Sequence, residues 1–209
     1  FFNPKAGLNY DVNSKNSIYF SFASANREPN RDDYTSGDPK PEQLNDFELG
    51  WRLATEKSNV NVTAYYMKYK NQLVLTGALS DVGAPLRENV GDSYRLGLEV
   101  DANIYISNKW LLRPNIALSQ NKNEDYYFQK DGNLVSLGNT NIAFSPNIVA
   151  GNCVTFAPSE NLQFSILSKF VGKQFMGNID SVNSELPSYF VNDLNISYEI
   201  QPKNVFKSV

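Results

Sequence analysis

Strict alternation of apolar and polar residues is the dominant pattern in this chain. In the clearest run, residues 94–106, every second residue is apolar, and the residues between them include Arg95, Glu99 and Asp101. A period of two places such apolar side chains on one face of a β-strand. An α-helix would instead mix these charges with the apolar residues. The run is therefore predicted to be a strand with one apolar and one polar face.

The same alternation recurs along the chain, which predicts about ten strands and no amphipathic helix. Pro114 and Pro146 lie on apolar faces, where each removes a hydrogen-bond donor from the sheet, so each is expected to mark a bulge or a local break. Cys153 falls on a polar face. A tenth strand is expected to begin near Val205. The other alternating segments are 5–12, 18–23, 47–54, 60–66, 110–119, 142–151, 162–166 and 190–200.

Short and long connections alternate between these segments. This rhythm is typical of antiparallel neighbours in an outer-membrane barrel, which has short periplasmic turns and long extracellular loops. Greek-key crossings in a soluble sandwich would disturb it. The predicted fold class is therefore all-β, an antiparallel up-and-down transmembrane β-barrel. The short turns are 13–16, 55–59, 107–109, 158–161 and 201–204, and the long connections are 24–43, 71–92, 120–140 and 172–188.

Composition alone suggests a water-soluble protein, with a mean hydropathy of −0.42 and 41% hydrophobic residues. A membrane barrel gives the same average, because each strand presents an apolar side chain to lipid only at every second position. Aromatic residues gather near the predicted strand ends, as an interfacial girdle requires. The alternative is a soluble β-sheet binding or adhesion module whose polar face meets water. The aromatic residues are Phe20, Phe22, Trp51, Trp110, Phe156 and Tyr189.

The counts of His and Cys and the positions of the carboxylates argue against an enzyme. The chain has no His and one Cys, which removes His-based nucleophilic catalysis and Cys/His zinc sites. The carboxylates of the polar face are scattered and predict no acid/base pair. The net charge of −3 without a basic stripe is unsuited to nucleic acid. We therefore predict no catalytic residue, no metal ligand, no cofactor and no nucleic-acid partner.

Residues 26–51 carry the most specific motif. Residues 27–31 read Arg-Glu-Pro-Asn-Arg, followed by Lys-Pro-Glu at 40–42 and Glu-Leu-Gly-Trp at 48–51. This resembles TonB-dependent outer-membrane receptors, in which an FREP-like strand end, a loop and a P-E…E-x-G element follow one another. Asn26 stands where that family often has Phe, and Pro39 where it has Leu. Residues 4–10, 61–74 and 89–99 resemble further strands of the same family.

The resemblance implies a barrel of 22 strands in the bacterial outer membrane, filled by an N-terminal plug and energised by the TonB complex. Residues 1–209 are then expected to form part of one β-barrel domain, with the plug and the final strand absent. Such a piece leaves two unpaired edges in lipid and is expected not to transport by itself. The implied partners are outer-membrane lipid, TonB through the missing N-terminal region, and a scarce small molecule. A ferric siderophore is the default cargo, with cobalamin or a glycan as alternatives.

Five residues of the long connections are candidate ligand contacts. Arg27, Arg31 and Tyr34 lie in the first connection, where arginine suits anionic chelates, and Tyr126 and Tyr127 lie in the third. The alternative for the arginines is that they organise the strand end through local ion pairs. The alternative for the tyrosines is an aromatic cluster at the membrane interface. Two acids resemble recurrent acids of the family and are equally explained by packing at the loop base and by lumen polarity, namely Glu42 and Glu48.

Overall fold

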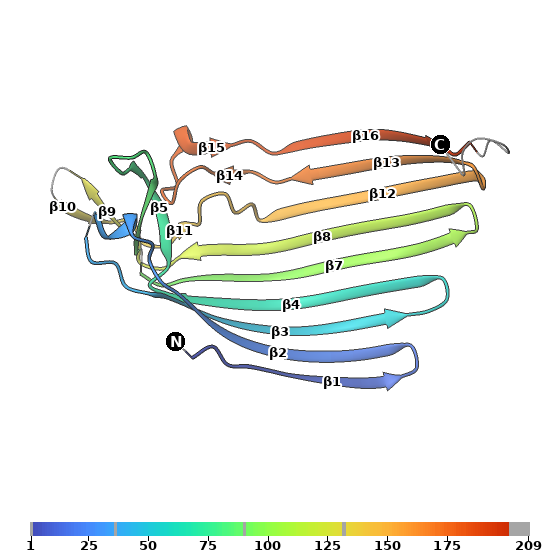
Figure 1. Cartoon of the computed structure of the whole chain (residues 1–209), viewed down its shortest axis with the longest axis horizontal. Coiled ribbons are helices and arrows are strands. Elements are labelled where there is room, and N and C mark those ends of the chain that lie inside the picture. The colour runs from blue at the N-terminus through green and yellow to red at the C-terminus, as the bar shows by residue number, and fades with distance from the viewer. Residues whose placement is uncertain (1, 36, 90, 131–132, 201–209) are drawn as a thin grey trace.

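A computed structural model describes residues 2–35, 37–89, 91–130 and 133–200. Within these ranges the regular elements are strands and two short 3₁₀ helices (Figure 1). The elements are β1 (Lys5–Asn13), β2 (Asn16–Arg27), η1 (Asp32–Thr35), β3 (Glu42–Ala54), β4 (Ser58–Lys70), β5 (Leu73–Leu79), β6 (Pro85–Asn89), β7 (Ser93–Ser107), β8 (Trp110–Asn123), β9 (Tyr127–Lys130), β10 (Asn133–Ser136), β11 (Thr140–Asn141), β12 (Ile148–Ser159), β13 (Leu162–Val171), β14 (Gln174–Phe175), η2 (Val182–Ser184), β15 (Glu185–Leu186) and β16 (Tyr189–Tyr198).

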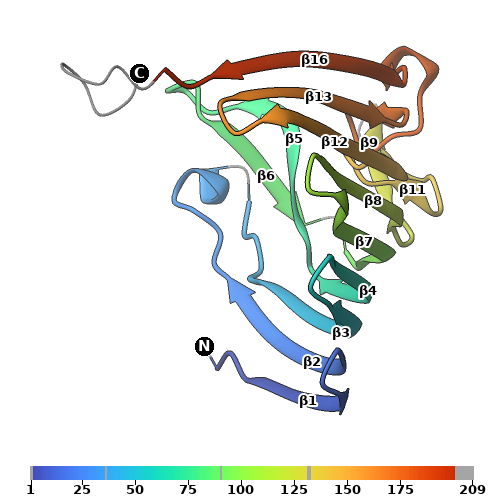
Figure 2. The ribbon, with the colours of Figure 1, turned by 90° about the vertical axis from the view of Figure 1, so that its right-hand side faces the viewer.

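One antiparallel sheet of 10 strands organises the chain, in the order β1-β2-β3-β4-β7-β8-β12-β13-β16, with β11 added beside β8. The all-β antiparallel fold and the number of strands predicted from the sequence are confirmed. The tenth strand of the sheet is β11, and the strand expected near Val205 lies outside the described residues. Figure 2 shows that the sheet curves into an open trough from β1 to β16 and does not close.

The long strands place the short turns at one end of the trough and the long connections at the other (Figure 1). The turns between β1 and β2, β3 and β4, β7 and β8, and β12 and β13 lie where the sequence predicted them. Their short lengths keep the two strands of each of these four pairs adjacent and antiparallel, and the strands joined by long connections also pair antiparallel. No helix among the described residues is long and apolar enough to cross a membrane.

The pairing register aligns the apolar side chains into continuous rows across the convex face. Because side chains alternate between faces, a slip of one residue would turn every row to the other face. Aromatic rings contact each other within these rows. Trp110 stacks on Phe156 with 4.5 Å between the ring centroids, and Phe22 and Phe47 form a tilted pair with 4.9 Å between theirs. One row, read from strand to strand, consists of Leu8, Phe20, Leu49, Ala64, Leu98, Leu118 and Ile148.

The convex face has no covering layer within the described chain. Many of its large apolar side chains are exposed, including Leu8, Leu49 and Leu98. Contiguous exposed apolar surface of this extent requires a partner or an apolar medium. Few apolar residues are buried in the described part of the chain. Two lie in the β5–β6 hairpin, one in β7, one in the segment before β12 and one at the end of β13, in this order: Leu73, Leu86, Ala102, Ile142 and Val171.

The long connections contain hairpins that the sequence analysis missed. β5 pairs with β6, β9 with β10, and β14 with β15, each as a two-stranded sheet. These strands are short, so the alternation of apolar and polar residues extends over only a few positions in each of them. Such short runs give a weak periodic signal in the sequence. These hairpins fold the connections back on themselves at the loop end of the trough (Figure 1).

Pro146 corrects one predicted boundary. The strand expected from residue 142 begins at Ile148, since Phe144 has a φ of 51° and residues 142–147 are irregular. This segment still follows β8, because Ser119 donates from its backbone N–H to Asn147 and from its hydroxyl to Pro146. Pro146 is therefore just outside a strand, where its missing N–H removes no ladder bond.

Pro114 behaves as predicted. It lies inside β8. The pairing of β8 with β7 is interrupted between the pair Asp101–Asn115 and the pair Ile104–Leu112, and the register is the same on both sides of this gap. The proline thus makes a local break, and the register shift of this strand pair lies nearer the turn, between Tyr105 and Ser107.

A charge on the convex face should prevent correct assembly. We expect Leu98→Arg to reduce the stability of the detergent-refolded full-length protein by about 2–4 kcal/mol, because arginine would be buried in hydrocarbon. The matched control is Glu99→Arg on the opposite face of the same strand, which should leave the unfolding midpoint nearly unchanged. Equal destabilisation by both substitutions, measured by urea unfolding in detergent, would contradict a lipid-facing convex surface.

Candidate functional site

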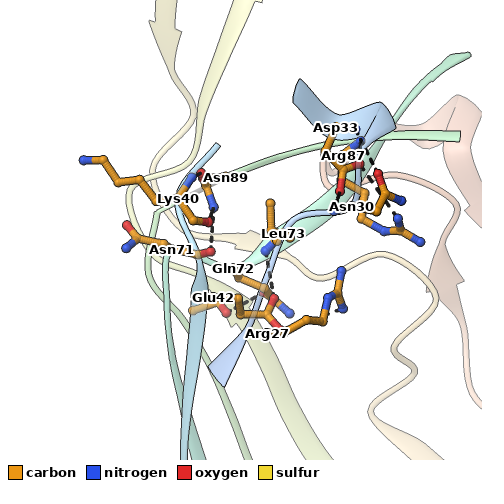
Figure 3. A network of polar contacts seen from close by, with 11 residues as sticks. Arg27, Asn30, Asp33, Lys40, Glu42, Asn71, Gln72, Leu73, Arg87 and Asn89 are labelled. Atoms are coloured by element: carbon orange, nitrogen blue, oxygen red, sulfur yellow. Dashed lines mark hydrogen bonds and ion pairs between the residues drawn. The ribbon is translucent and has the colours of Figure 1, made fainter. Parts of the chain in front are cut away.

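At the loop end of the trough, polar contacts join the first two long connections (Figure 3). One group of these contacts surrounds η1, which begins in a reciprocal pair of backbone caps. The Asn30 backbone N–H donates to the Asp33 carboxylate at 2.8 Å, and the Asp33 backbone N–H donates to the Asn30 side-chain oxygen at 2.9 Å. This exchange resembles a capping box, in which two residues three apart satisfy each other's free donors.

Asp33 also attaches η1 to β6. Its other carboxylate oxygen accepts from the Arg87 backbone N–H at 3.1 Å and lies 3.8 Å from the Arg87 guanidinium. Asp33 is only 2% exposed, and each carboxylate oxygen has a partner, as a buried charge requires. The Asp33 carboxylate therefore fixes the first connection against the β5–β6 hairpin.

Glu42 provides the second attachment. It begins β3, is buried, and accepts a hydrogen bond from the Leu73 backbone N–H at 2.8 Å. The same carboxylate lies 3.8 Å from the guanidinium of Arg27 at the end of β2. Glu42 thus connects the start of the hairpin to the base of the first connection, which confirms packing at the loop base as one of its roles.

Asn89 closes the network on its far side. Its side chain accepts from the Lys40 backbone N–H at 2.7 Å and donates to the backbone carbonyls of Lys40 and Asn71. A single side-chain amide therefore links the end of β6 to the base of the first connection and to the segment before β5. Asp33, Glu42 and Asn89 together define what we call the loop clamp.

The first group of predicted ligand residues lies around η1. Arg27 forms an ion pair with Glu42 of the loop clamp, which supports the local structural alternative. Arg31 has no ion-pair partner among the described residues and lines a surface hollow with Leu79, Val82 and Leu86 of the hairpin region. Tyr34 is 48% exposed. Arg31 and Tyr34 are thus available at the surface, whereas Arg27 is partly engaged.

The second group lies across β6 from the first. Tyr127 is 58% exposed and lines another hollow with Asn89, Asp92 and Glu124. Tyr126 is half-buried, and burial raises the pKa of its phenol, with the Glu88 carboxylate adding to the effect. The Tyr126 hydroxyl therefore remains protonated at neutral pH and can donate a hydrogen bond.

The structure brings all five residues to the loop end but separates them into two clusters. Successive side chains of β6 point to opposite faces, so Arg87 meets η1 while Glu88 lies towards Tyr126. Sequence reasoning missed the roles of Asp33 and Asn89. The spacing of Asn30 and Asp33 was a usable signal for the former, since it is the spacing of a reciprocal cap.

Below the loops, the concave face of the trough is polar and hydrogen-bonded from strand to strand. Tyr19 and Thr63 share a hydrogen bond of 2.8 Å, and the guanidinium of Arg52 lies 4.1 Å from the Tyr19 ring centroid. Ser21 donates to Glu48 at 3.1 Å, so Glu48 serves lumen polarity, the second role considered for these acids. Cys153 also lies on this face, 3.2 Å from the Arg113 guanidinium.

The described residues contain no cluster of His, Cys, Asp and Glu that could hold a metal ion. What the geometry offers instead is a polar, charged wall that leads from the two clusters at the loop end. Such an arrangement can bind a polar solute and guide it along the strands.

Solved structures with a similar fold include siderophore receptors and a copper transporter. A mutant of the ferric enterobactin receptor PfeA of Pseudomonas aeruginosa aligns with a TM-score of 0.69, 17% identity, 97% of this chain and 33% of its own. The siderophore receptor PiuA of Acinetobacter baumannii aligns with a TM-score of 0.72 and 19% identity, over 97% of this chain and 29% of its own. The copper transporter OprC aligns with a TM-score of 0.70 and 15% identity, over 93% of this chain and 30% of its own. This chain therefore spans about a third of the length of these structures. No curated protein sequence matches it.

The sequence itself matches a family model over its whole length. The model is described as TonB dependent receptor-like, beta-barrel, and it covers residues 1–209. The barrels of this family are outer-membrane proteins and transport receptors. The paired rows of the convex face, the polar concave wall and this match agree: the chain belongs to the TonB-dependent receptor β-barrel family.

Proposed function

We propose that this chain forms one wall of a bacterial outer-membrane receptor that takes up a ferric siderophore with energy supplied through TonB. One observation carries the proposal: Arg31, Tyr34, Tyr126 and Tyr127 flank the β5–β6 hairpin at the mouth of the polar wall. Anionic ferric chelates with aromatic groups suit arginine and tyrosine side chains. Similar folds include receptors for ferric enterobactin, which supports the same cargo class.

Within this proposal, residues 1–209 are part of one barrel domain. The remaining strands, the plug and the contact with TonB belong to other parts of the receptor. The unpaired edges of β1 and β16 fit that arrangement, because every residue of both strands is exposed. An open edge in lipid leaves backbone groups unsatisfied, and neighbouring barrel strands would satisfy them.

Copper is the second cargo that a similar structure suggests, since OprC is a copper transporter. Copper favours imidazole, thiolate and thioether ligands. This chain has no His, one Cys and two Met, and Cys153 contacts Arg113 and Thr155 on the concave face. A copper site would need most of its ligands from elsewhere in the receptor, so the siderophore is the better supported cargo.

The cargo class is tested by direct binding to the full-length receptor in detergent. We expect tryptophan fluorescence to be quenched by ferric enterobactin at submicromolar concentration, and not by cyanocobalamin or maltohexaose. Growth on the same siderophore as the iron source should require both the receptor gene and TonB. Binding of cyanocobalamin or the sugar in place of the siderophore would replace the proposed cargo with that alternative.

Arg31→Ala is the sharpest test of the proposed contact. We expect the Kd for ferric enterobactin to rise about tenfold, because a hydrogen bond to a charged group is worth about 1.5–3 kcal/mol and 1.4 kcal/mol corresponds to a factor of ten. Lys57→Ala, which removes a cation at the short-turn end, is the matched control. An unchanged Kd for Arg31→Ala would remove this residue from the site.

The loop clamp should keep the β5–β6 hairpin in place beside Arg31. We expect Glu42→Ala to accelerate amide hydrogen exchange at Leu73 and across residues 73–89 by about tenfold to a hundredfold. Losing the acceptor leaves a buried N–H unpaired at a cost of about 1–3 kcal/mol. Glu28→Ala, at an exposed position in the same connection, is the control and should not change exchange. Unaltered exchange in the Glu42 variant would show that the hairpin is held by other contacts.

A further inference from the structure

The chain leaves the sheet between β11 and β12, which both pair with β8. Between the last pair of β11 and the first pair of β12, β8 has three residues, 119–121, whereas the facing chain has six, 142–147. Figure 1 shows this stretch as the irregular trace that leads into β12. The additional residues have no partners in the sheet, so they form a fold of their own. We call residues 142–146 the inward segment.

Side chains of the concave face hold the inward segment on the lumen side of the wall. The Arg95 guanidinium donates to the Ser145 hydroxyl at 2.9 Å, and the Ser119 hydroxyl donates to the Pro146 carbonyl at 3.2 Å. Arg95 and Ser119 occupy odd-numbered positions of β7 and β8, and the even-numbered positions of these strands form the convex rows. Asn121, at the next concave position of β8, is buried. The inward segment therefore lies over the concave face at the loop end.

Phe144 occupies the centre of the inward segment in an unfavourable backbone conformation. Its φ of 51° lies in the left-handed region. Among the described residues other than glycine, only Asn71 and Asp125 share a positive φ. Asn and Asp adopt this conformation more readily than other residues, whereas a bulky side chain makes it a true outlier. Such strain persists only where the surrounding structure determines the backbone.

Hydrogen bonds determine the backbone on both sides of Phe144. The Phe144 backbone N–H donates to the Phe175 carbonyl at 2.8 Å, and the Ala143 backbone N–H donates to the Asn178 side-chain oxygen at 3.0 Å. The Ser145 hydroxyl donates to the Ala143 carbonyl at 3.0 Å. Neither the Phe144 ring nor any other part of its side chain takes part in these bonds. The inward segment is therefore held by polar contacts to the sheet and to the fourth connection.

The Phe144 side chain gains little packing in exchange for this strain. The residue is 59% exposed, and its ring contacts no other aromatic ring within the described part of the chain. Glycine would adopt the same φ without strain. Strained residues of this kind cluster at ligand-binding sites. An exposed aromatic ring at such a position on the lumen side is therefore suited to contact a solute.

We propose that Phe144 contacts an aromatic group of the cargo where the loops meet the polar wall. This inference rests on the proposed function, because it takes the cargo to be a siderophore with aromatic groups. The connection that carries Tyr126 and Tyr127 continues through β11 into the inward segment, so Phe144 lies between these tyrosines and the wall. Aromatic rings attract one another in offset-stacked and edge-to-face arrangements. The Phe144 ring therefore favours an aromatic chelate over an aliphatic one.

Phe144→Gly separates a cargo contact from a structural role. In the full-length receptor in detergent, we expect the Kd for ferric enterobactin to rise about tenfold, because the contact area of the ring is lost. The thermal midpoint should stay equal or rise, because glycine accepts the left-handed φ. Phe144→Tyr should keep the Kd within about twofold, because it retains an aromatic ring. The control is Phe190→Leu at a convex position that is 60% exposed, and it should leave the Kd unchanged.

The outcomes distinguish this contact from the proposed function. If the wild-type receptor and the Phe144→Gly receptor bind ferric enterobactin equally well, the contact is wrong and the proposed function stands. A lower thermal midpoint of the Phe144→Gly receptor would assign the ring to packing and overturn the contact. Absence of binding by the wild-type receptor would overturn the proposed function and the contact together.

Thiol labelling in native outer membranes tests where the ring lies. Phe144→Cys in a full-length Cys153→Ser receptor should react with a small membrane-impermeant maleimide. Saturating ferric enterobactin should slow this reaction about tenfold or more, because a bound ligand covers the wall of its site. Phe190→Cys is the matched control and should react slowly with or without the siderophore. An unreactive residue 144 would show that lipid or another part of the receptor covers it, and an unchanged rate with the siderophore would likewise overturn the contact.

Discussion

The structure depends on keeping one side of every long strand apolar and the other polar. The described sheet buries few apolar residues against its own chain, and its convex rows remain exposed. Hydrophobic burial inside the chain therefore cannot be the main reason for this shape. The apolar rows are satisfied by lipid, and the register that aligns them also assembles the hydrogen-bonded polar wall on the other face. The proposed transport depends on this division, because each strand presents one apolar face and one polar face.

The loop end solves a different problem, which is to hold long polar connections without a lipid or sheet framework. Asp33, Glu42 and Asn89 do so by accepting backbone N–H groups from segments far apart in the sequence. The carboxylates of Asp33 and Glu42 are buried and paired, which favours a rigid loop base. In the proposed function, a rigid loop base keeps Arg31 and the three candidate tyrosines at fixed places around the hairpin, which lowers the ordering cost of binding.

Sequence reasoning captured the strands because their alternation extends over many residues, as in residues 94–106, and because polar turns separate them. It did not find the β5–β6 hairpin, whose strands are short and whose partner contacts come from Glu42 and Asp33 in another connection. It placed the strand start near residue 142 instead of Ile148, since alternation cannot register a positive φ at Phe144. The structure places the candidate ligand residues at the loop end, with Arg27 at the end of β2, and their role in binding stays a prediction. Their separation by β6 depends on tertiary packing, which a sequence pattern does not show.

The central claim is that even-numbered residues of β7 face lipid and odd-numbered residues face the lumen. The most direct measurement is thiol accessibility in native outer membranes, with single cysteines at Leu98 and Glu99 in a Cys153→Ser receptor. The account predicts rapid labelling of the Glu99→Cys receptor by a small membrane-impermeant maleimide and little labelling of the Leu98→Cys receptor. Equal labelling at both positions, or faster labelling at Leu98, would contradict it.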